Sequence, residues 1–264
     1  MLEIQNVSKT FNPGTVNEKI ALQNVSLTLG DGDFVTVIGG NGAGKSTLLN
    51  AVAGTWSVDE GEIVIDGVNV THMPEHKRAK YIGRVFQDPM MGTAATMQIE
   101  ENLALAMRRG KSRTLRIGIT ASEREMYIEL LKTLNLGLEE RLTSKVGLLS
   151  GGQRQALTLL MATLQKPKLL LLDEHTAALD PKTAAKVLET TETIIQRDHL
   201  TTLMITHNMR DAIAHGDRLI MMYEGRIAVD IFGEEKKRMK VEDLLQLFEK
   251  ASGEALANDR MLLG

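Results

Sequence analysis

Short apolar runs alternate with polar turns in the first quarter of the chain, and this pattern predicts strands. Residues 2–7 alternate between apolar and polar side chains, and residues 20–29 form a second such run. The runs 62–65 and 68–70 flank Asp66-Gly67, a dipeptide typical of a two-residue β-hairpin turn. We therefore expect an antiparallel β layer in this part of the chain.

Other apolar runs have few polar positions, which is typical of parallel strands covered on both faces. Such runs occupy residues 34–38, 81–86, 169–172 and 201–205, and a last pair at 219–222 and 227–229 predicts a hairpin. Segments with helical periodicity lie between them, at 47–53, 98–108, 122–136, 154–164 and 181–197. Strands that alternate with helices predict an α/β fold with a parallel core sheet.

The order of these elements also predicts how the chain is divided. Residues of about 90–160 are mostly helical and indicate a helical subdomain inserted in the core of a domain spanning 1–235. Residues 236–264 would form a C-terminal helix and tail, with an amphipathic helix at 241–250 and a poorly anchored end from residue 252. We expect the charged run 234–238 to lie in solvent.

Composition excludes several classes of protein. Among 264 residues, 43% are apolar and 25% are charged, as in ordinary soluble domains, and the net charge of −3 gives no overall attraction to nucleic acid or acidic membranes. The chain has no cysteine and hence no disulfide or thiolate metal site. No apolar run approaches the ~18 residues of a spanning helix, and the N-terminus does not resemble a signal peptide. Any action at a membrane would need a partner.

A glycine-rich loop follows the predicted strand 34–38 and precedes the helix 47–53. It fits the P-loop pattern G-x-x-x-x-G-K-[ST], and its phosphate-binding candidates are Gly39, Asn41, Gly42, Gly44, Lys45, Ser46 and Thr47. Glycines let consecutive backbone N–H groups converge on one anion, and the helix N-terminus adds partial positive charge. We expect Lys45 to reach the β- and γ-phosphates and the Ser46 hydroxyl to ligate Mg²⁺. A glycine-rich turn with a chance lysine is the alternative, but the flanking strand and helix favour the motif.

Polar side chains also end other core strands. Asp173 and Glu174 follow the run 169–172, at the edge where α/β sheets bind ligands. Asp173 can hold Mg²⁺, and Glu174 can accept a proton from an attacking water. His207 ends the strand 201–205 at the same edge and can donate to a γ-phosphate, while Gln87 can place its carbonyl on the metal or the water. A structural role is the alternative for both.

A second anion site is predicted at the start of the helix 154–164. Ser150 is a good N-cap, and Gly151-Gly152 before Gln153 leave backbone N–H groups open. The two sites suggest two halves that clamp one polyphosphate. Asp180-Pro181 turns the chain into the helix 181–197.

Two further features have open interpretations. Phe11, beside the Pro13-Gly14 turn, can stack on adenine or fold back on the sheet. The segment 108–116 holds five positive charges, which would meet phosphate head groups or a partner's acidic loop, or simply lie in solvent.

Taken in this order, the motifs resemble those of the ATP-binding cassette (ABC) ATPases over residues 1–232. The resemblance implies a RecA-like P-loop core, with ATP and Mg²⁺ as cofactors. It implies that Phe11 stacks on adenine, that Gln87 touches Mg²⁺ or water, and that Asp180 crosses a dimer interface. The signature residues Ser150, Gly151, Gly152 and Gln153 would bind the nucleotide held by the opposite protomer, with Ser150 and Gly152 on its γ-phosphate. The family's working unit is a head-to-tail homodimer that sandwiches two ATP molecules.

Two positions depart from the family's pattern. His175 stands where proline is usual, and residues 154–157 lack a second arginine often found after the signature. Because His175 adds a titratable group beside Glu174, one hypothesis is a small shift on the acid side of the ATPase pH profile.

A single cassette without a membrane segment is similar to the separate ATPase subunit of a membrane transporter. This resemblance implies integral-membrane permease partners, attachment to the cytoplasmic face of the cell membrane and, in an importer, an extracytoplasmic substrate-binding protein. Import of a small solute such as an amino acid is the favoured expectation, and no nucleic-acid partner is expected. The alternatives are an exporter subunit, a soluble ABC ATPase and a plain P-loop kinase.

Overall fold

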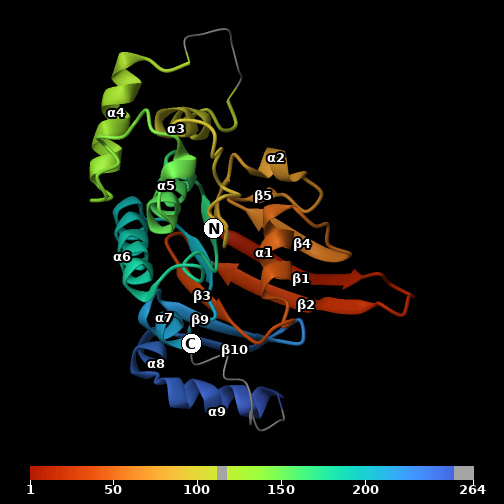
Figure 1. The fold of residues 1–264 in the computed structure, drawn as a ribbon. Coiled ribbons are helices and arrows are strands. Elements are labelled where there is room, and N and C mark those ends of the chain that lie inside the picture. Colours follow the sequence, from red (N-terminus) through yellow and green to blue (C-terminus); the bar gives the residue numbers. More distant parts are fainter. Residues whose placement is uncertain (112–117, 253–264) are drawn as a thin grey trace.

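The core of the chain is a six-stranded sheet, seen in a computed structural model that describes residues 1–111 and 118–252 (Figure 1). Its strand order is β10-β9-β3-β8-β7-β6. The bounds are β3 (Phe34–Ile38), β6 (Ile82–Val85), β7 (Leu169–Asp173), β8 (Thr202–Ile205), β9 (Arg218–Tyr223) and β10 (Arg226–Phe232). Only β10 is antiparallel to its neighbour.

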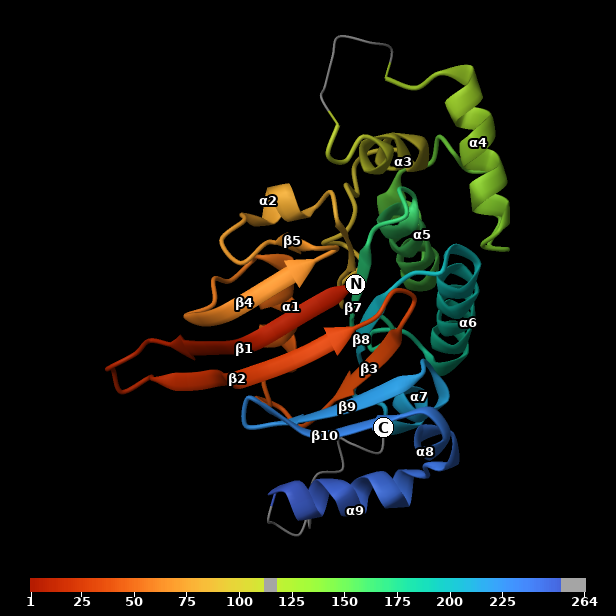
Figure 2. The ribbon, with the colours of Figure 1, turned by 180° about the vertical axis from the view of Figure 1, so that it is seen from behind.

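A second, antiparallel sheet lies beside the first, in the order β2-β1-β4-β5 (Figure 2). Its strands are β1 (Leu2–Phe11), β2 (Lys19–Leu29), β4 (Glu60–Ile65) and β5 (Val68–Asn69). The expectation that the first strand ends near residue 7 was wrong. Residues up to Phe11 pair with β2, so Phe11 ends a strand instead of lying in the following turn.

Helices fill the space between the sheets and cover the far face of the core sheet. They are α1 (Lys45–Ala53), α2 (Glu75–Arg78), α3 (Ile99–Met107), α4 (Ala121–Lys132), the 3-10 turn η1 (Val146–Leu148), α5 (Gly151–Thr163), α6 (Pro181–Asp198), α7 (Met209–Ala214), α8 (Gly233–Arg238) and α9 (Val241–Ser252). Helix α5 begins three residues earlier than expected, because the Ser150 side chain caps it. No helix within 1–111 and 118–252 has the length and apolar character needed to cross a bilayer.

The burial of β7 on both faces explains why its first four residues, 169–172, are all apolar. Leu169 and Leu171 pack into a core with α1 and the antiparallel sheet, whereas Leu170 and Leu172 pack into a second core with α3, α4, α5 and α6. All four are at most 1% exposed. A strand buried on both faces has no side for polar residues. The α/β class predicted from the alternating runs is confirmed.

The charged run 234–238 does not lie wholly in solvent, which corrects the expectation. It forms most of α8, and Lys236 is 2% exposed. Its ammonium donates to the carbonyls of His215 and, at 2.7 Å, of Gly216, so a buried lysine ties α8 to the end of α7. Burial lowers the pKa of Lys236 to about 8.

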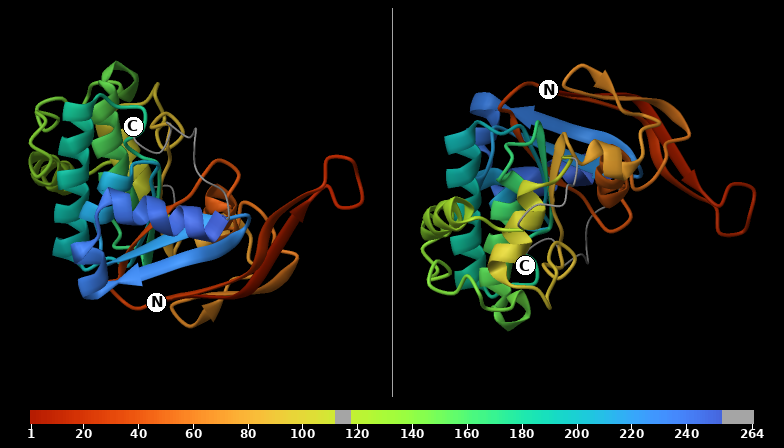
Figure 3. Two further views of the ribbon diagram at one scale, coloured as in Figure 1. Left: turned by 90° about the horizontal axis from the view of Figure 1, so that it is seen from below. Right: turned by 90° about the horizontal axis from the view of Figure 1, so that it is seen from above.

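Helix α9 packs on β9 and β10 through Leu244 and Phe248 (Figure 3). Helix α8 runs across the expected domain boundary between residues 235 and 236. The division of the chain into 1–235 with a helical insert at 90–160, and 236–264, stays a prediction. The tail expected from residue 252 lies, from 253 on, outside the described residues.

Replacing Leu171 by alanine tests the two-sided burial of β7. We expect the free energy of unfolding to fall by about 2–5 kcal/mol, because the variant loses a fully buried side chain and leaves a cavity. Urea denaturation followed by circular dichroism measures this change. The matched control is Leu105→Ala on α3, where the side chain is 44% exposed and the cost should stay below about 1 kcal/mol. Equal losses in both variants would contradict the assignment.

Candidate nucleotide-binding site

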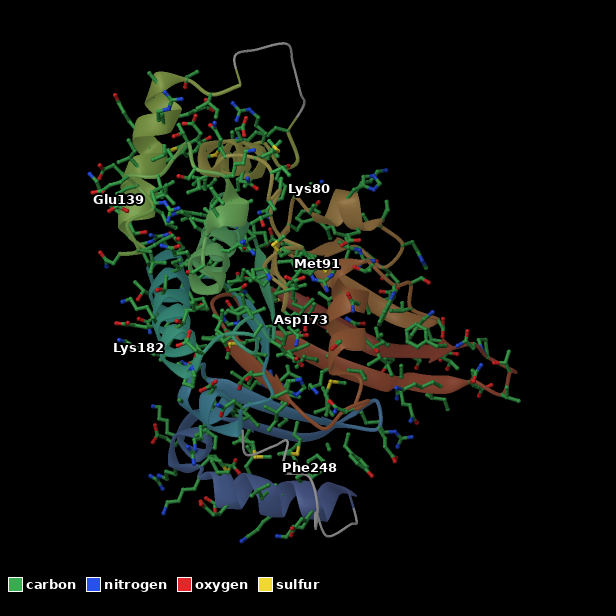
Figure 4. The ribbon with its side chains drawn as sticks, in the orientation of Figure 1. Lys80, Met91, Glu139, Asp173, Lys182 and Phe248 are labelled. Atoms are coloured by element: carbon green, nitrogen blue, oxygen red, sulfur yellow. The ribbon has the colours of Figure 1, made fainter. Side chains whose placement is uncertain are left out.

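The predicted site residues gather where the parallel strands end. Strands β6, β7, β8 and β3 run side by side, with Val85 opposite Leu172, Asp173 opposite Ile205, and Ile205 opposite Val37. The segments that follow these strands therefore leave the sheet at one edge. Figure 4 shows Asp173 near the centre of the molecule, between the helices and the antiparallel sheet.

One cleft at this edge brings together most of the predicted residues. It is lined by Phe11, Lys19, Ala21, Asn41, Gly42, Ala43, Gly44, Lys45, Ser46, Thr47, Trp56, Gln87, Glu174 and His207. Phe11 lies 36 positions before Thr47 on α1 and 196 positions before His207 after β8, so only the fold brings these residues together. The cleft holds both the phosphate-binding loop and the proposed acid–base groups.

The loop from Gly39 to Gly44 depends on close backbone contacts. A Cβ at Gly39 would lie 2.3 Å from the carbonyl oxygen of Met222, and one at Gly44 would lie 2.5 Å from that of Ala21. Gly44 caps α1 in the left-handed region, with φ of 103°, and no side chain satisfies the N-terminal N–H groups of the helix. These donors are left for an anion in the cleft.

Lys45 lies inside this loop. Its ammonium donates to the carbonyls of Gly39, at 2.7 Å, and Gly40, at 3.3 Å, and the residue is 6% exposed. Burial lowers the pKa of Lys45, and the carboxylates of Glu174 and Asp173 oppose that shift. A phosphate group bound in the loop would accept from the same ammonium.

Glu174 and His207 contact each other. His207 Nε2 lies 2.5 Å from Glu174 Oε1, and Glu174 is 8% exposed. The backbone of Glu174 is left-handed, with φ of 46°, and its N–H donates to the carbonyl of Ile205. The turn after β7 and the end of β8 thus place a carboxylate and an imidazole together, a pair that can activate and orient a water molecule.

Asp173 has a partner that sequence reasoning missed. Arg84, on the neighbouring strand β6, brings Nη2 to 3.6 Å from Asp173 Oδ2 and also donates to Asn50 and Thr55. Burial raises the pKa of the Asp173 carboxyl, and Arg84 opposes that rise. Oxygen donors such as Asp173 and the Ser46 hydroxyl are the ligand type that Mg²⁺ prefers, so both residues fit the expected ion. The sequence feature that could have indicated this partner is an arginine within an otherwise apolar strand.

The signature residues do not line this cleft. Ser150 accepts from the Gln153 N–H and Gln153 Oε1 accepts from the Ser150 N–H, so the two form a capping box at the start of α5. Gly152 is needed for packing, because a Cβ there would lie 2.1 Å from Thr183 Cγ2 on α6. Gly151 stays exposed beside it.

Asp180 caps α6 by accepting from the Thr183 N–H at 3.1 Å. Hydrogen bonding from Thr183, first from its side chain and then from its N–H, lowers the pKa of Asp180. Ser150, Gly151, Gly152, Gln153 and Asp180 are all described, and none touches the cleft. A second copy of the chain would bring them to a nucleotide, as the family resemblance implies.

The far end of the cleft has two aromatic rings. Phe11 and Trp56 meet edge to face, with centroids 4.9 Å apart and planes at 80°. Phe11 was predicted as a base-stacking residue, whereas Trp56 was missed. The sequence feature that could have indicated Trp56 as a site residue is its position, as the single tryptophan of the chain, three residues after the helix that follows the P-loop.

The basic segment is partly used by the fold. Arg108 donates to the Ala104 carbonyl and to Glu123, and Arg109 donates to the Ala162 carbonyl. Both guanidinium groups are therefore engaged within the fold and are not free to bind a partner. Residues 112–116 lie outside the described residues, so the role of the segment stays open.

His175 does not extend the acid–base site. It is 2% exposed, and its Nε2 lies 3.1 Å from Thr191 Oγ1 on α6. Burial lowers the pKa of His175 to about 4, with a smaller effect from His215. The imidazole is thus neutral at neutral pH. The turn directs the side chain into α6, and the shift expected on the acid side of the ATPase pH profile stays a prediction.

Replacing Arg84 by methionine tests its role beside Asp173. We expect about ten-fold more Mg²⁺ for half-maximal ATP binding, because Asp173 loses the group that orients it. Calorimetric ATP titrations at stepped Mg²⁺ concentrations measure this, with Arg84→Lys expected in between. An unchanged or lower Mg²⁺ requirement would refute the assignment.

Replacing His175 by glutamine tests the neutral buried imidazole. A folded pKa of about 4 against an ordinary value of 6.5 means that the unfolded chain binds the proton first as pH falls. The stability that the wild type gains from its neutral imidazole should be complete above pH 6.5. Between about pH 6.5 and 4 the wild type should lose up to about 3 kcal/mol of its free energy of unfolding, and the variant should show no such loss. Urea denaturation at stepped pH checks this. The ATPase profile near neutral pH should not differ between the two proteins.

Comparisons with known proteins agree with this geometry. A family model described as ABC transporter matches residues 22–177. A tyrosine transport ATP-binding protein of Clostridioides difficile (strain R20291) is 44% identical over 251 residues, which cover 95% of this chain and 100% of that protein. The spermidine/putrescine import ATP-binding protein PotA of Pasteurella multocida (strain Pm70) is 32% identical over 87% of this chain, which spans only 58% of that relative.

Solved structures with the same fold include nucleotide-bound cassettes. The dimeric post-hydrolysis state of the ATP-binding cassette MJ0796 bound to ADP and Pi has a TM-score of 0.75 at 30% identity, over 88% of this chain and 98% of that one. The ADP conformation of the cassette MJ1267 has a TM-score of 0.78 at 28% identity, over 96% and 99%. The P-loop fold inferred from the sequence is thereby confirmed. The chain belongs to the ABC transporter family and is an ATP-binding cassette ATPase that uses ATP and Mg²⁺.

Proposed function

We propose that this chain powers the import of a small solute, an amino acid, with tyrosine or a related aromatic amino acid as the first candidate substrate. The observation that carries the proposal is the 44% identity to a tyrosine transport ATP-binding protein over that relative's whole length. The polyamine importers are less similar and extend well beyond this chain. The amino acid itself would bind to the permease and to an extracytoplasmic substrate-binding protein.

In the proposed mechanism two copies of the chain close over two ATP molecules. Lys45 and the loop N–H groups hold the β- and γ-phosphates of ATP in one copy, and Phe11 stacks on its adenine. Ser150, Gly151, Gly152 and Gln153 of the other copy complete the site, with Asp180 at the interface. The dimeric form of the related cassette MJ0796 supports this arrangement.

Hydrolysis would then use the pair at the strand ends. Glu174 accepts a proton from water while the water oxygen attacks the γ-phosphorus, and the bond to the bridging oxygen of the leaving ADP breaks. His207 Nε2 contacts the Glu174 carboxylate in the structure, and with ATP bound we expect the imidazole to donate to the γ-phosphate instead. Ser46, Asp173 and Gln87 would hold Mg²⁺, which supplies neutralising charge to the phosphates.

The coupling to transport would run through the segment after Gln87. Met90 and Met91, three and four residues on, are 44% and 69% exposed, and flexible thioethers adapt well to a partner surface. Arg154 on α5 contacts the Met90 sulfur, so this segment is tied to the signature helix. We place the permease here, which puts the chain on the cytoplasmic face of the cell membrane.

The variant Glu174→Gln tests both catalysis and the dimer. The amide keeps the shape of the side chain but cannot accept the proton, so turnover should fall at least about 10²-fold. Size-exclusion chromatography in Mg-ATP should show a stable dimer, because bound ATP is no longer consumed. The control is Glu129→Gln on α4, whose exposed carboxylate forms an ion pair with Lys132 on the same helix. A monomeric Glu174→Gln protein in saturating Mg-ATP, in the presence of the permease, would contradict the clamp.

Uptake of labelled tyrosine tests the substrate. Cells that lack this chain should lose uptake and regain it with the wild type and with Glu129→Gln, but not with Glu174→Gln. Labelled spermidine serves as the comparison. Restoration of spermidine uptake alone would reject the amino acid and leave the ATPase assignment intact.

A further inference from the structure

The aromatic end of the cleft is built from residues of two separate segments. Only 3% of the chain is aromatic, and tryptophan occurs once. Trp56 nevertheless lines the cleft with Phe11 and keeps 36% of its surface exposed. It does not belong to the buried core clusters formed by the described residues. A large apolar ring held at the mouth of a polar cleft is available for a flat apolar ligand group.

The surroundings fix these rings in place. Asp59, three residues after Trp56, accepts from the Lys9 ammonium at 2.7 Å and from the Thr10 N–H at 2.6 Å. The segment 56–59 is thereby fastened to the end of β1, where Phe11 lies. The Lys9 ammonium also lies 5.6 Å from the centre of the Phe11 ring.

The same segment continues directly from α1. That helix carries Lys45 and Ser46 at its start and ends at Ala53, three residues before Trp56. One short helix therefore connects the phosphate end of the cleft to its aromatic end. The turn between the helix and Trp56 is held by hydrogen bonds from the N–H groups of Thr55 and Trp56 to the carbonyl of Asn50.

We propose that Trp56 is a positioning residue for the purine base of ATP. Its ring holds Phe11 perpendicular to itself, so that Phe11 keeps one orientation, and it adds a second apolar surface to the base end of the cleft. The inference rests on the proposed stacking of Phe11 on adenine. The phosphates are held elsewhere, by the loop and Lys45, so the two halves of the ligand can be tested apart.

The test compares two ligands in the full chain. Trp56→Leu should weaken Mg-ATP binding about 3- to 10-fold in calorimetry, the size of effect expected for a lost aromatic pair. Binding of Mg-triphosphate, which has no base, should change less than about two-fold. Trp56→Phe should restore most of the ATP affinity. The matched control is Phe232→Leu, an aromatic residue that is 68% exposed on β10, away from the cleft, and it should bind both ligands as the wild type does.

Two results would overturn the inference. Trp56→Leu could bind ATP as the wild type does, or it could lose ATP and triphosphate equally, which would make Trp56 a support of the whole loop. As a second readout, Mg-ATP should change the fluorescence of this sole tryptophan in the wild type, and triphosphate should not. A wild type that binds triphosphate but shows no preference for ATP would instead reject the proposed stacking of Phe11.

Discussion

The hydrogen bonding of β7 between β6 and β8 is the constraint on which the site depends. Because these strands and β3 are parallel, their carboxyl ends lie at one edge of the sheet. The residues that follow the strands therefore lie close together. The four leucines before Asp173 are buried on both faces of the sheet, which fixes the strand against sliding or tilting. The positions of the candidate catalytic residues thus depend on apolar packing some residues away.

Charges in and beside the cleft are balanced between buried groups, with Lys45 in its lining and Arg84 and Asp173 outside that lining. Burial disfavours the charged forms of Lys45 and Arg84 and also that of Asp173, and each of these groups is partly compensated by a neighbour of opposite sign. Glu174 adds a carboxylate that contacts His207. A polyphosphate and a divalent cation add both signs of charge to this cleft. Binding can therefore proceed without leaving a buried charge unpaired.

The elements with strong local patterns could be predicted from the sequence. The strand at 34–38, the P-loop and the helix after it agree with the structure because periodicity, glycine spacing and helix start all lie within about 20 residues. The same holds for the fully apolar strand before Asp173. Motifs of this kind carry their structural context with them.

What the sequence could not predict depends on contacts between distant segments. Arg84 with Asp173, Trp56 with Phe11 and Lys236 with the end of α7 each join residues 20 or more positions apart. His175 shows a different limit: a residue next to Glu174 in the chain points into α6, because successive side chains leave a turn in different directions. Neither composition nor spacing carries that information.

The near absence of space between Gly152 and Thr183 has a mechanical consequence. The Thr183 side chain fills the space that a Cβ at position 152 would need, so the first turns of α5 and α6 lie in direct contact. The start of α6 is fastened to Asp180 through the cap on Thr183. We therefore expect a displacement of the signature at the start of α5 to be passed through this contact to Asp180, the residue that precedes α6.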